Sequence, residues 1–260
     1  MSTPVSLDEV AGYLDGYLSI REIPDEAGAV NGLQVENGSR LIERIVAAVD
    51  ISQATIDGVI GAGHARNTLL IVHHGLLWDG NVAVTGRRYR RLRALIDHEI
   101  AVYAAHIPLD IHPEVGNNVG LATSLGCVDL APFDGYKGIA LGVRGRFPEP
   151  MARSTVGARL NALLETESRL IPGGPELITN IGVITGAAGS RIRAAREAGL
   201  DGFVTGEGAH HTYFDAMEYG INVFYAGHYA TEQVGVQALA RHLSERFALP
   251  WEFHRHPTGL

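Results

Sequence analysis

The sequence predicts an α/β protein whose helices pack on mostly parallel or mixed sheets. Short runs rich in β-branched and aromatic residues alternate almost from end to end with segments of helical periodicity. This alternation is typical of strands joined by crossover helices. Three of the apolar runs end on histidine, and ligands of open α/β sheets collect at the carboxyl ends of strands. We therefore expect a polar site at these strand ends.

The expected strands are short apolar runs, bounded by turn-forming residues or by helical segments. They cover residues 45–49, 68–72, 100–104, 139–143, 181–184, 202–205 and 221–225. Among the expected helices, one opens at a capping box formed by Ser6 and Glu9, one includes residues 191–196, and one covers residues 230–239.

Two of the histidine strand ends also carry a carboxylate four residues further on. The residues are His73 with His74, then His106 with Asp110, and finally His228 with Glu232. Imidazole nitrogens and acidic oxygens together are ligands of divalent transition metals. Adjacent strand residues point to opposite faces, so both members of the first pair bind only if the strand breaks there, and Gly75 permits that break.

Five residues form the expected ligand set, with His106 as a candidate sixth: His73, His74, Asp110, His228 and Glu232. A catalytic zinc usually takes three protein ligands and one water, so five or six ligands suit two ions better than one. In two-metal sites the ions commonly share a carboxylate, a role suited to Glu232 or Asp110. The simpler alternative, which stays open here, is a set of core or solvated histidines at loop ends.

Several motifs in order make the chain resemble a known family, the NGG-interacting-factor-like proteins, also called GTP cyclohydrolase 1 type 2 homologs. They occupy residues 31–35, 49–55, 73–75, 106–110, 116–118, 205–211 and 227–232. The resemblance implies a two-domain fold and a dinuclear metal site on the five ligands above, with His106 beside the metals. It also implies a homo-oligomer, a ring of six, and opening of the GTP imidazole ring with loss of formate.

Two interlinked α/β domains are expected. Residues 129–135 are rich in turn formers and follow the helix expected after Asp110, which favours a boundary there. If His228 rejoins the first site, the chain returns to the first domain near residue 226. We therefore predict a discontinuous metal-site domain of residues 1–128 and 226–260, with a second α/β domain of residues 129–225 inserted into it.

Composition excludes several classes of protein. Hydrophobic residues make up 46% of the chain and charged residues 19%, and no apolar run reaches the ~20 residues that span a bilayer. The net charge of −8 argues against general nucleic-acid binding. Cys127 is the only cysteine, so an internal disulfide is excluded. Residues 1–9 lack the pattern of an export signal, and we expect a cytoplasmic protein without membrane contact.

Several other motifs each have two possible roles. Five arginines between positions 87 and 93, Arg90 among them, suit either phosphate binding or a solvated helix face or subunit contact. Residues 185–190 favour a tight strand-to-helix turn over a phosphate site. Glu207 either supports a metal ligand or moves protons, Asp50 ends a strand with the same ambiguity, and His210 with His211 either contacts substrate or caps the pocket.

The sequence thus predicts a dinuclear divalent-metal-dependent hydrolase acting on a nucleotide or another small phosphorylated or heterocyclic substrate. His106 and Glu207 are the expected catalytic proton carriers, and Arg90 and His210 the expected substrate contacts. Mixed nitrogen and oxygen ligands permit zinc, manganese, iron, cobalt or nickel. The competing hypothesis is a non-enzymatic metal-binding regulatory or assembly protein. A nucleic-acid-associated ring is a third, weakened by the negative charge.

Overall fold

The computed structural model describes residues 3–259, and it divides into two α/β units. The first unit contains the described residues up to Leu109 together with residues 236–256. The second contains residues 110–235 and the end of the chain from Pro257. The second unit is therefore inserted into the first. Helices cover two mixed sheets, so the predicted fold class is confirmed.

A five-stranded sheet with the order β13-β4-β5-β6-β2 forms the centre of the first unit. Its strands are β2 (Gly32–Val35), β4 (Arg44–Asp50), β5 (Thr68–His74), β6 (Ile100–Ala104) and β13 (Trp251–Phe253). All neighbours are parallel except β2, which is antiparallel to β6. A separate antiparallel pair joins β1 (Val5–Ser6) to β3 (Leu41–Ile42).

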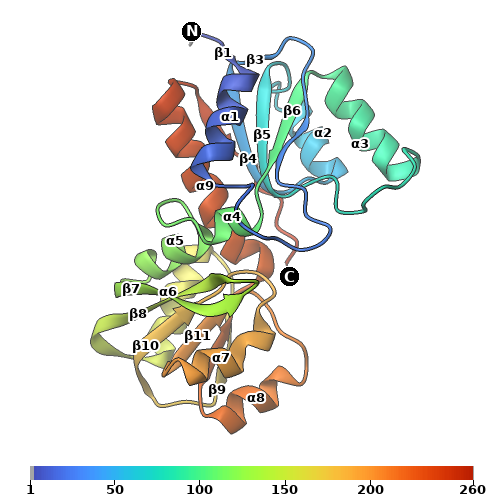
Figure 1. The fold of residues 1–260 in the computed structure, drawn as a ribbon. Coiled ribbons are helices and arrows are strands. Elements are labelled where there is room, and N and C mark those ends of the chain that lie inside the picture. Colours follow the sequence, from blue (N-terminus) through green and yellow to red (C-terminus); the bar gives the residue numbers. More distant parts are fainter. Residues whose placement is uncertain (1–2, 260) are drawn as a thin grey trace. The chain divides into compact units, whose positions relative to one another are not determined.

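Helices cover both faces of this sheet, which explains why its central strands are almost wholly apolar. They are α1 (Leu7–Tyr17), α2 (Gln53–Gly61), α3 (Gly86–Asp97) and the part of α9 (His228–Phe247) from residue 236 onward. Figure 1 shows α1 and α9 on one face and α2 and α3 on the other. Leu70 and Val72, alternate residues of β5, belong to the same core cluster as Ile56 of α2 and Leu95 of α3.

The second unit has a six-stranded mixed sheet with the order β7-β8-β10-β11-β12-β9. Its strands are β7 (Val128–Tyr136), β8 (Ile139–Ala152), β9 (Arg169–Pro172), β10 (Leu177–Val183), β11 (Gly202–Thr205) and β12 (Asn222–Tyr225). The helical segments are α4 (Ile107–Asp110), which crosses the boundary, then α5 (Asn117–Ser124), α6 (Arg153–Leu164), η1 (Gly189–Arg191), α7 (Ile192–Glu197) and α8 (Thr212–Tyr219). Only β10, β11 and β12 run parallel to one another.

Adjacent residues of β11 show how this sheet is buried on both faces. Val204 belongs to the core cluster that includes residues of α5 and α6, whereas Phe203 belongs to the cluster that includes residues of α7 and α8. Side chains along a strand alternate between faces, so one apolar strand serves two cores. All seven strands expected from the sequence are found, with ends that differ by a few residues except in β8, which extends to Ala152.

The structure differs from the expected organisation in two places. The units divide after Leu109 and after Gly235, rather than after residues 128 and 225, because α5 and the first turns of α9 belong to the second unit. Residues 129–135, expected as a boundary, lie within β7. This strand is at the edge of its sheet, where Pro132 removes no hydrogen bond that a second neighbour needs.

Helix α1 begins where the sequence predicts, although its capping differs. Ser6 is the N-cap residue, but its side chain makes no capping hydrogen bond. The amide of Leu7 instead donates to the carbonyl oxygen of Arg40 at 2.9 Å. Within residues 3–259 no helix combines the length and the apolar character needed to cross a bilayer.

Candidate metal centre

Both histidines at the end of β5 contribute to one cluster. His73 and His74 are the last residues of the strand, and their ring centroids lie 4.8 Å apart. Pairing of β5 with β6 extends only to Val72, so the backbone is no longer held on that side when the histidines begin. Gly75 follows in a tightly packed position, where a Cβ atom would come within 2.3 Å of Gln34 Nε2. Any larger residue would displace that amide.

His106, which comes soon after β6 ends, joins the same cluster. Its ring centroid lies 5.0 Å from that of His73 and 5.7 Å from that of His74. Each of the three offers a nitrogen atom, and these atoms lie within 4.8 Å of one another. All three belong to the first unit, so this unit alone assembles three imidazole donors.

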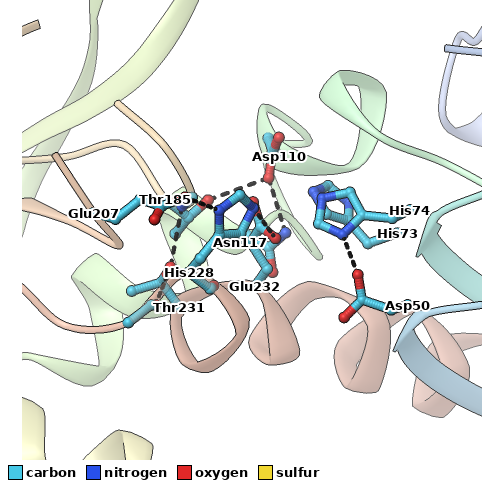
Figure 2. A network of polar contacts seen from close by, with 12 residues as sticks. Asp50, His73, His74, Asp110, Asn117, Thr185, Glu207, His228, Thr231 and Glu232 are labelled. Carbon is cyan, nitrogen blue, oxygen red and sulfur yellow. Dashed lines mark hydrogen bonds and ion pairs between the residues drawn. The ribbon is translucent and has the colours of Figure 1, made fainter. Parts of the chain in front are cut away.

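Each of these three imidazoles makes a hydrogen bond between its Nδ1 atom and an oxygen atom of the first unit. The pairs are His73 with the carbonyl oxygen of Ala105 at 2.9 Å, His74 with Asp50 Oδ1 at 2.7 Å (Figure 2), and His106 with Asp25 Oδ1 at 2.6 Å. A carbonyl oxygen only accepts hydrogen bonds, as does an ionised carboxylate. In a neutral imidazole such a contact favours the proton on Nδ1 and leaves Nε2 as the electron-pair donor. Histidines that bind metals usually have this second contact.

The second unit collects three further predicted ligands. His228 and Glu232 lie one turn apart at the start of α9, with His228 Nε2 3.1 Å from Glu232 Oε2. A carboxylate oxygen of Asp110 lies within 4.8 Å of one of Glu232. Both carboxylates are buried. Two buried negative charges so close together repel, and a bound cation would offset that repulsion.

Neutral hydrogen-bond donors hold Asp110 in place. Asn117 Nδ2 donates to Asp110 Oδ1 at 2.9 Å, and Thr185 Oγ1 contacts the same oxygen at 3.2 Å (Figure 2). The oxygen of the Asn117 side chain accepts from the amide of Gly235 in α9 at 2.6 Å. One asparagine therefore connects the carboxylate to the helix that carries His228 and Glu232.

Two carboxylates surround His228. Its Nδ1 lies 2.7 Å from Glu207 Oε1, and its Nε2 faces Glu232. Burial disfavours the charged imidazolium, but hydrogen bonds and charges of Glu232 and Glu207 outweigh burial and raise the pKa of His228 to about 9. A metal ion would compete with the Nε2 proton for the same position.

The turn after β10 is shaped by Glu232. Gly186 has a φ of +68°, which favours glycine, and a Cβ atom there would lie 2.2 Å from Glu232 Oε1. Residues 185–190 therefore form a tight turn that continues into η1. The geometry of this turn explains why Gly186 is a glycine, with no need for a phosphate-binding role.

The donor types fit divalent metal ions. Three imidazoles with protonated Nδ1 atoms and two buried carboxylates suit zinc, manganese, iron, cobalt or nickel. The first unit supplies three imidazole nitrogens, and the second supplies two carboxylates and one imidazole. Each set is positioned by contacts within its own unit.

The other predicted site residues lie on exposed surfaces. Arg90 is exposed on α3 in the first unit. Within the same arginine cluster, Arg87 pairs with Asp79 at 2.9 Å and Arg93 with Asp97 at 3.1 Å. His210 is exposed in the second unit, with its ring 5.8 Å from that of Phe214, and His211 is exposed as well.

Sequence reasoning missed Asp25 altogether. This aspartate lies in the loop before β2, 81 residues before the histidine that it contacts. Desolvation by burial opposes its charge, yet hydrogen bonds from His106, Asn31 and the Glu26 amide, with the nearby His106 charge, lower its pKa. No fixed spacing to a metal ligand marked it in the sequence.

The family model of Duf34/NIF3 (NGG1p interacting factor 3) matches residues 5–257. The chain belongs to this family. The resemblance noted from the motifs is thereby confirmed. A Pyrococcus abyssi protein is 42% identical over 97% of this chain and 99% of its own length, and a Deinococcus radiodurans protein is 41% identical over 98% and 95%. Both are named GTP cyclohydrolase 1 type 2 homolog.

Two solved structures are similar to this chain over nearly its whole length. Protein TTHA1606 from Thermus thermophilus is 40% identical, with a TM-score of 0.89 over 98% of this chain and 100% of its own. Protein ybgI, described as of unknown function, is 32% identical, with a TM-score of 0.89 and the same coverage.

The raised pKa of His228 predicts a specific pH dependence of stability. Its folded-state pKa of about 9 lies above the ordinary value of 6.5, so the contacts with Glu207 and Glu232 stabilise the metal-free protein fully below pH 6.5. That stabilisation is lost as pH rises through about 9. Urea denaturation of chelator-treated protein at about pH 6 and about pH 10 should show it.

Glu207→Gln should reduce this pH-dependent loss, because it removes one of the two charges. Glu218→Gln is the matched control, since this carboxylate is exposed in the same unit. A change in stability with pH that is the same in both variants would contradict the assignment.

Proposed function

We propose that this NIF3-family chain is a divalent-metal-dependent hydrolase with two metal ions, acting on a nucleotide or another small phosphorylated or heterocyclic substrate. The observation that carries the proposal is the fixed orientation of the donors. Each of the three clustered imidazoles has an oxygen acceptor on Nδ1, and Asp110 has two hydrogen-bond donors on one carboxylate oxygen. Such second contacts fix the orientation of a metal ligand and the tautomer that leaves its coordinating nitrogen unprotonated.

Five residues are proposed as the ligands of the two ions: His73, His74, Asp110, His228 and Glu232. Their chemistry admits zinc, manganese, iron, cobalt or nickel. Glu232 or Asp110 is the proposed shared ligand, because a carboxylate has two oxygen atoms with which to bridge. Divalent ions in such a site make water acidic and polarise the bond that is hydrolysed.

The proposed catalytic residues, His106 and Glu207, handle protons. His106 keeps its own proton on Nδ1, beside Asp25, so its Nε2 atom is able to accept one from water or substrate. Glu207 accepts a hydrogen bond from His228 Nδ1 and thereby orients that ring. Half of the Glu207 side chain is exposed (48%), which lets it exchange protons with solvent.

The proposed substrate class rests on the family to which the chain belongs. The relatives named GTP cyclohydrolase 1 type 2 homolog support a purine nucleotide whose imidazole ring is opened with loss of formate. Arg90 is the proposed phosphate contact, since guanidinium groups bind phosphate oxygens through paired N–H donors. His210 is the proposed contact with the remainder of the substrate.

A non-enzymatic metal-binding or regulatory assembly protein is the second candidate. The burial of the ligand side chains favours this candidate, because His73 is fully buried and Glu232 is only 3% exposed. Structural metal sites are saturated by protein ligands, whereas catalytic sites keep one position open. Turnover distinguishes the two candidates.

Metal stoichiometry is the first test. We expect about two divalent ions per chain after reconstitution and removal of excess metal, because the ligand set suits two ions. Plasma emission analysis of the full chain measures this ratio. Glu232→Gln and His73→Ala should each lower it, and Glu218→Gln should not. A ratio of one or less that neither ligand change affects would exclude the dinuclear centre.

Turnover is the second test. A panel of nucleotides and phosphoesters with each candidate metal should yield a product, formate from GTP if the ring is opened or inorganic phosphate if a phosphate is removed. His228→Ala and Asp110→Asn should lower kcat by several powers of ten, while Arg90→Ala should mainly raise KM. If no substrate turns over with any of the metals, the enzymatic proposal gives way to the metal-binding assembly protein.

We also propose that the chain forms a homo-oligomer, a hexameric ring. Tyr213, Phe214, Met217 and Tyr219 of α8 are all at least 40% exposed, and surfaces of this kind often mark protein contacts. Cyclic symmetry closes repeated copies of one interface. Multi-angle light scattering should therefore report six copies at micromolar concentration, and a monomer throughout that range would contradict the ring.

A further inference from the structure

Asp25 is a buried carboxylate beside the three-histidine cluster that accepts several hydrogen bonds. Four donors approach its two oxygens: the Glu26 amide at 2.6 Å and His106 Nδ1 at 2.6 Å on Oδ1, and Asn31 Nδ2 at 2.8 Å and the Ile107 amide at 3.1 Å on Oδ2. Its side chain is 7% exposed. Four donors directed at one buried carboxyl group stabilise its ionised form.

We infer that Asp25 is a positioning residue that fixes the tautomer of His106, holding the proton on Nδ1 and leaving Nε2 as an acceptor. An ionised carboxylate has no proton to donate, so the short contact requires an N–H on His106. A neutral imidazole has only one N–H. Its second nitrogen is therefore the basic one.

The same loop holds the backbone as well as the ring of His106. Asn31 Oδ1 accepts from the His106 amide at 2.8 Å, while Asn31 Nδ2 donates to Asp25. The Trp78 ring meets the imidazole edge-on, at 4.9 Å between centroids and 86° between planes. Asp25 and Asn31 thus set both the position and the rotation of the imidazole beside His73 and His74.

The catalytic consequence rests on the proposed hydrolase function, in which His106 accepts a proton at Nε2. Asp25→Asn replaces one carboxylate oxygen by an NH₂ group. The remaining oxygen stays with the two donors on Oδ2, Asn31 and the Ile107 amide, so the NH₂ group takes the place of Oδ1. There it loses the hydrogen bond from the Glu26 amide and donates to His106 Nδ1. The ring then carries its proton on Nε2 and can no longer accept one there. The corresponding change in a serine-protease triad traps the wrong tautomer in this way.

Nitrogen-15 NMR of the full chain without metal tests the inference independently of any activity. The unsubstituted chain should show His106 with a protonated Nδ1 and an unprotonated Nε2, the signal being assigned through His106→Gln. Asp25→Asn should exchange the two nitrogen shifts, and Asp25→Glu should restore the original pattern. Asp15→Asn is the matched control, because this carboxylate accepts from the Tyr103 hydroxyl at 2.9 Å in the same unit.

A neutral ring with its proton on Nε2 and none on Nδ1 in the unsubstituted chain would overturn the inference, even if Asp25→Asn does not fold. So would an Asp25→Asn variant that folds and keeps the original nitrogen shifts. Once a substrate is known, Asp25→Asn should lower kcat by about 10²-fold or more with KM nearly unchanged, which is the usual size of a lost proton acceptor. The NMR result stands whether or not turnover is found, so failure of the proposed hydrolase and failure of this inference are distinguishable.

Discussion

Hydrogen bonds from imidazole Nδ1 atoms to fixed oxygen acceptors are the interactions on which the candidate centre depends. A polar ring such as that of His73 costs several kcal/mol to bury without a partner. The carbonyl oxygen of Ala105 supplies that partner from the end of the neighbouring strand. Parallel pairing of β5 and β6 is therefore a condition for burying His73 at all. The fold of the first unit and the chemistry of its histidines are consequences of the same pairing.

The second unit buries two carboxylates close together. Asp110 and Glu232 are both buried, and the contacts described for them are with neutral donors and an imidazole. Neutral dipoles from Asn117 and Thr185 solvate the first, and His228 contacts the second. The dipoles maintain the Asp110 carboxylate without cancelling its charge, whereas the raised pKa of His228 keeps a proton on the ring that faces Glu232 at neutral pH. A metal ion would take the place of that proton, whereas an arginine in the same position would have removed the need for a metal ion.

Sequence patterns were sufficient for features that repeat with a fixed spacing. Apolar runs gave the seven strands, and the four-residue separation of His228 and Glu232 gave their common helical turn. Asp25 could not be found in this way, because its contact with His106 is made by an irregular loop with no periodicity. The prediction of a domain boundary at residues 129–135 is wrong for the opposite reason. Proline and glycine usually mark turns, yet an edge strand such as β7 tolerates both.

The chain passes from the first unit to the second within α4 and returns to the first within α9. His106 and Asp110 are separated by a single helical turn of chain, although they belong to different units. His228 and Glu232 occupy the first turn of a helix whose later residues, such as Leu243, are buried in the first unit. One helix therefore supplies predicted ligands to the second unit in its first turn and core residues to the first unit in its later turns. Its sequence has to satisfy both demands, which is why polar donors and a wholly buried leucine occur in the same helix.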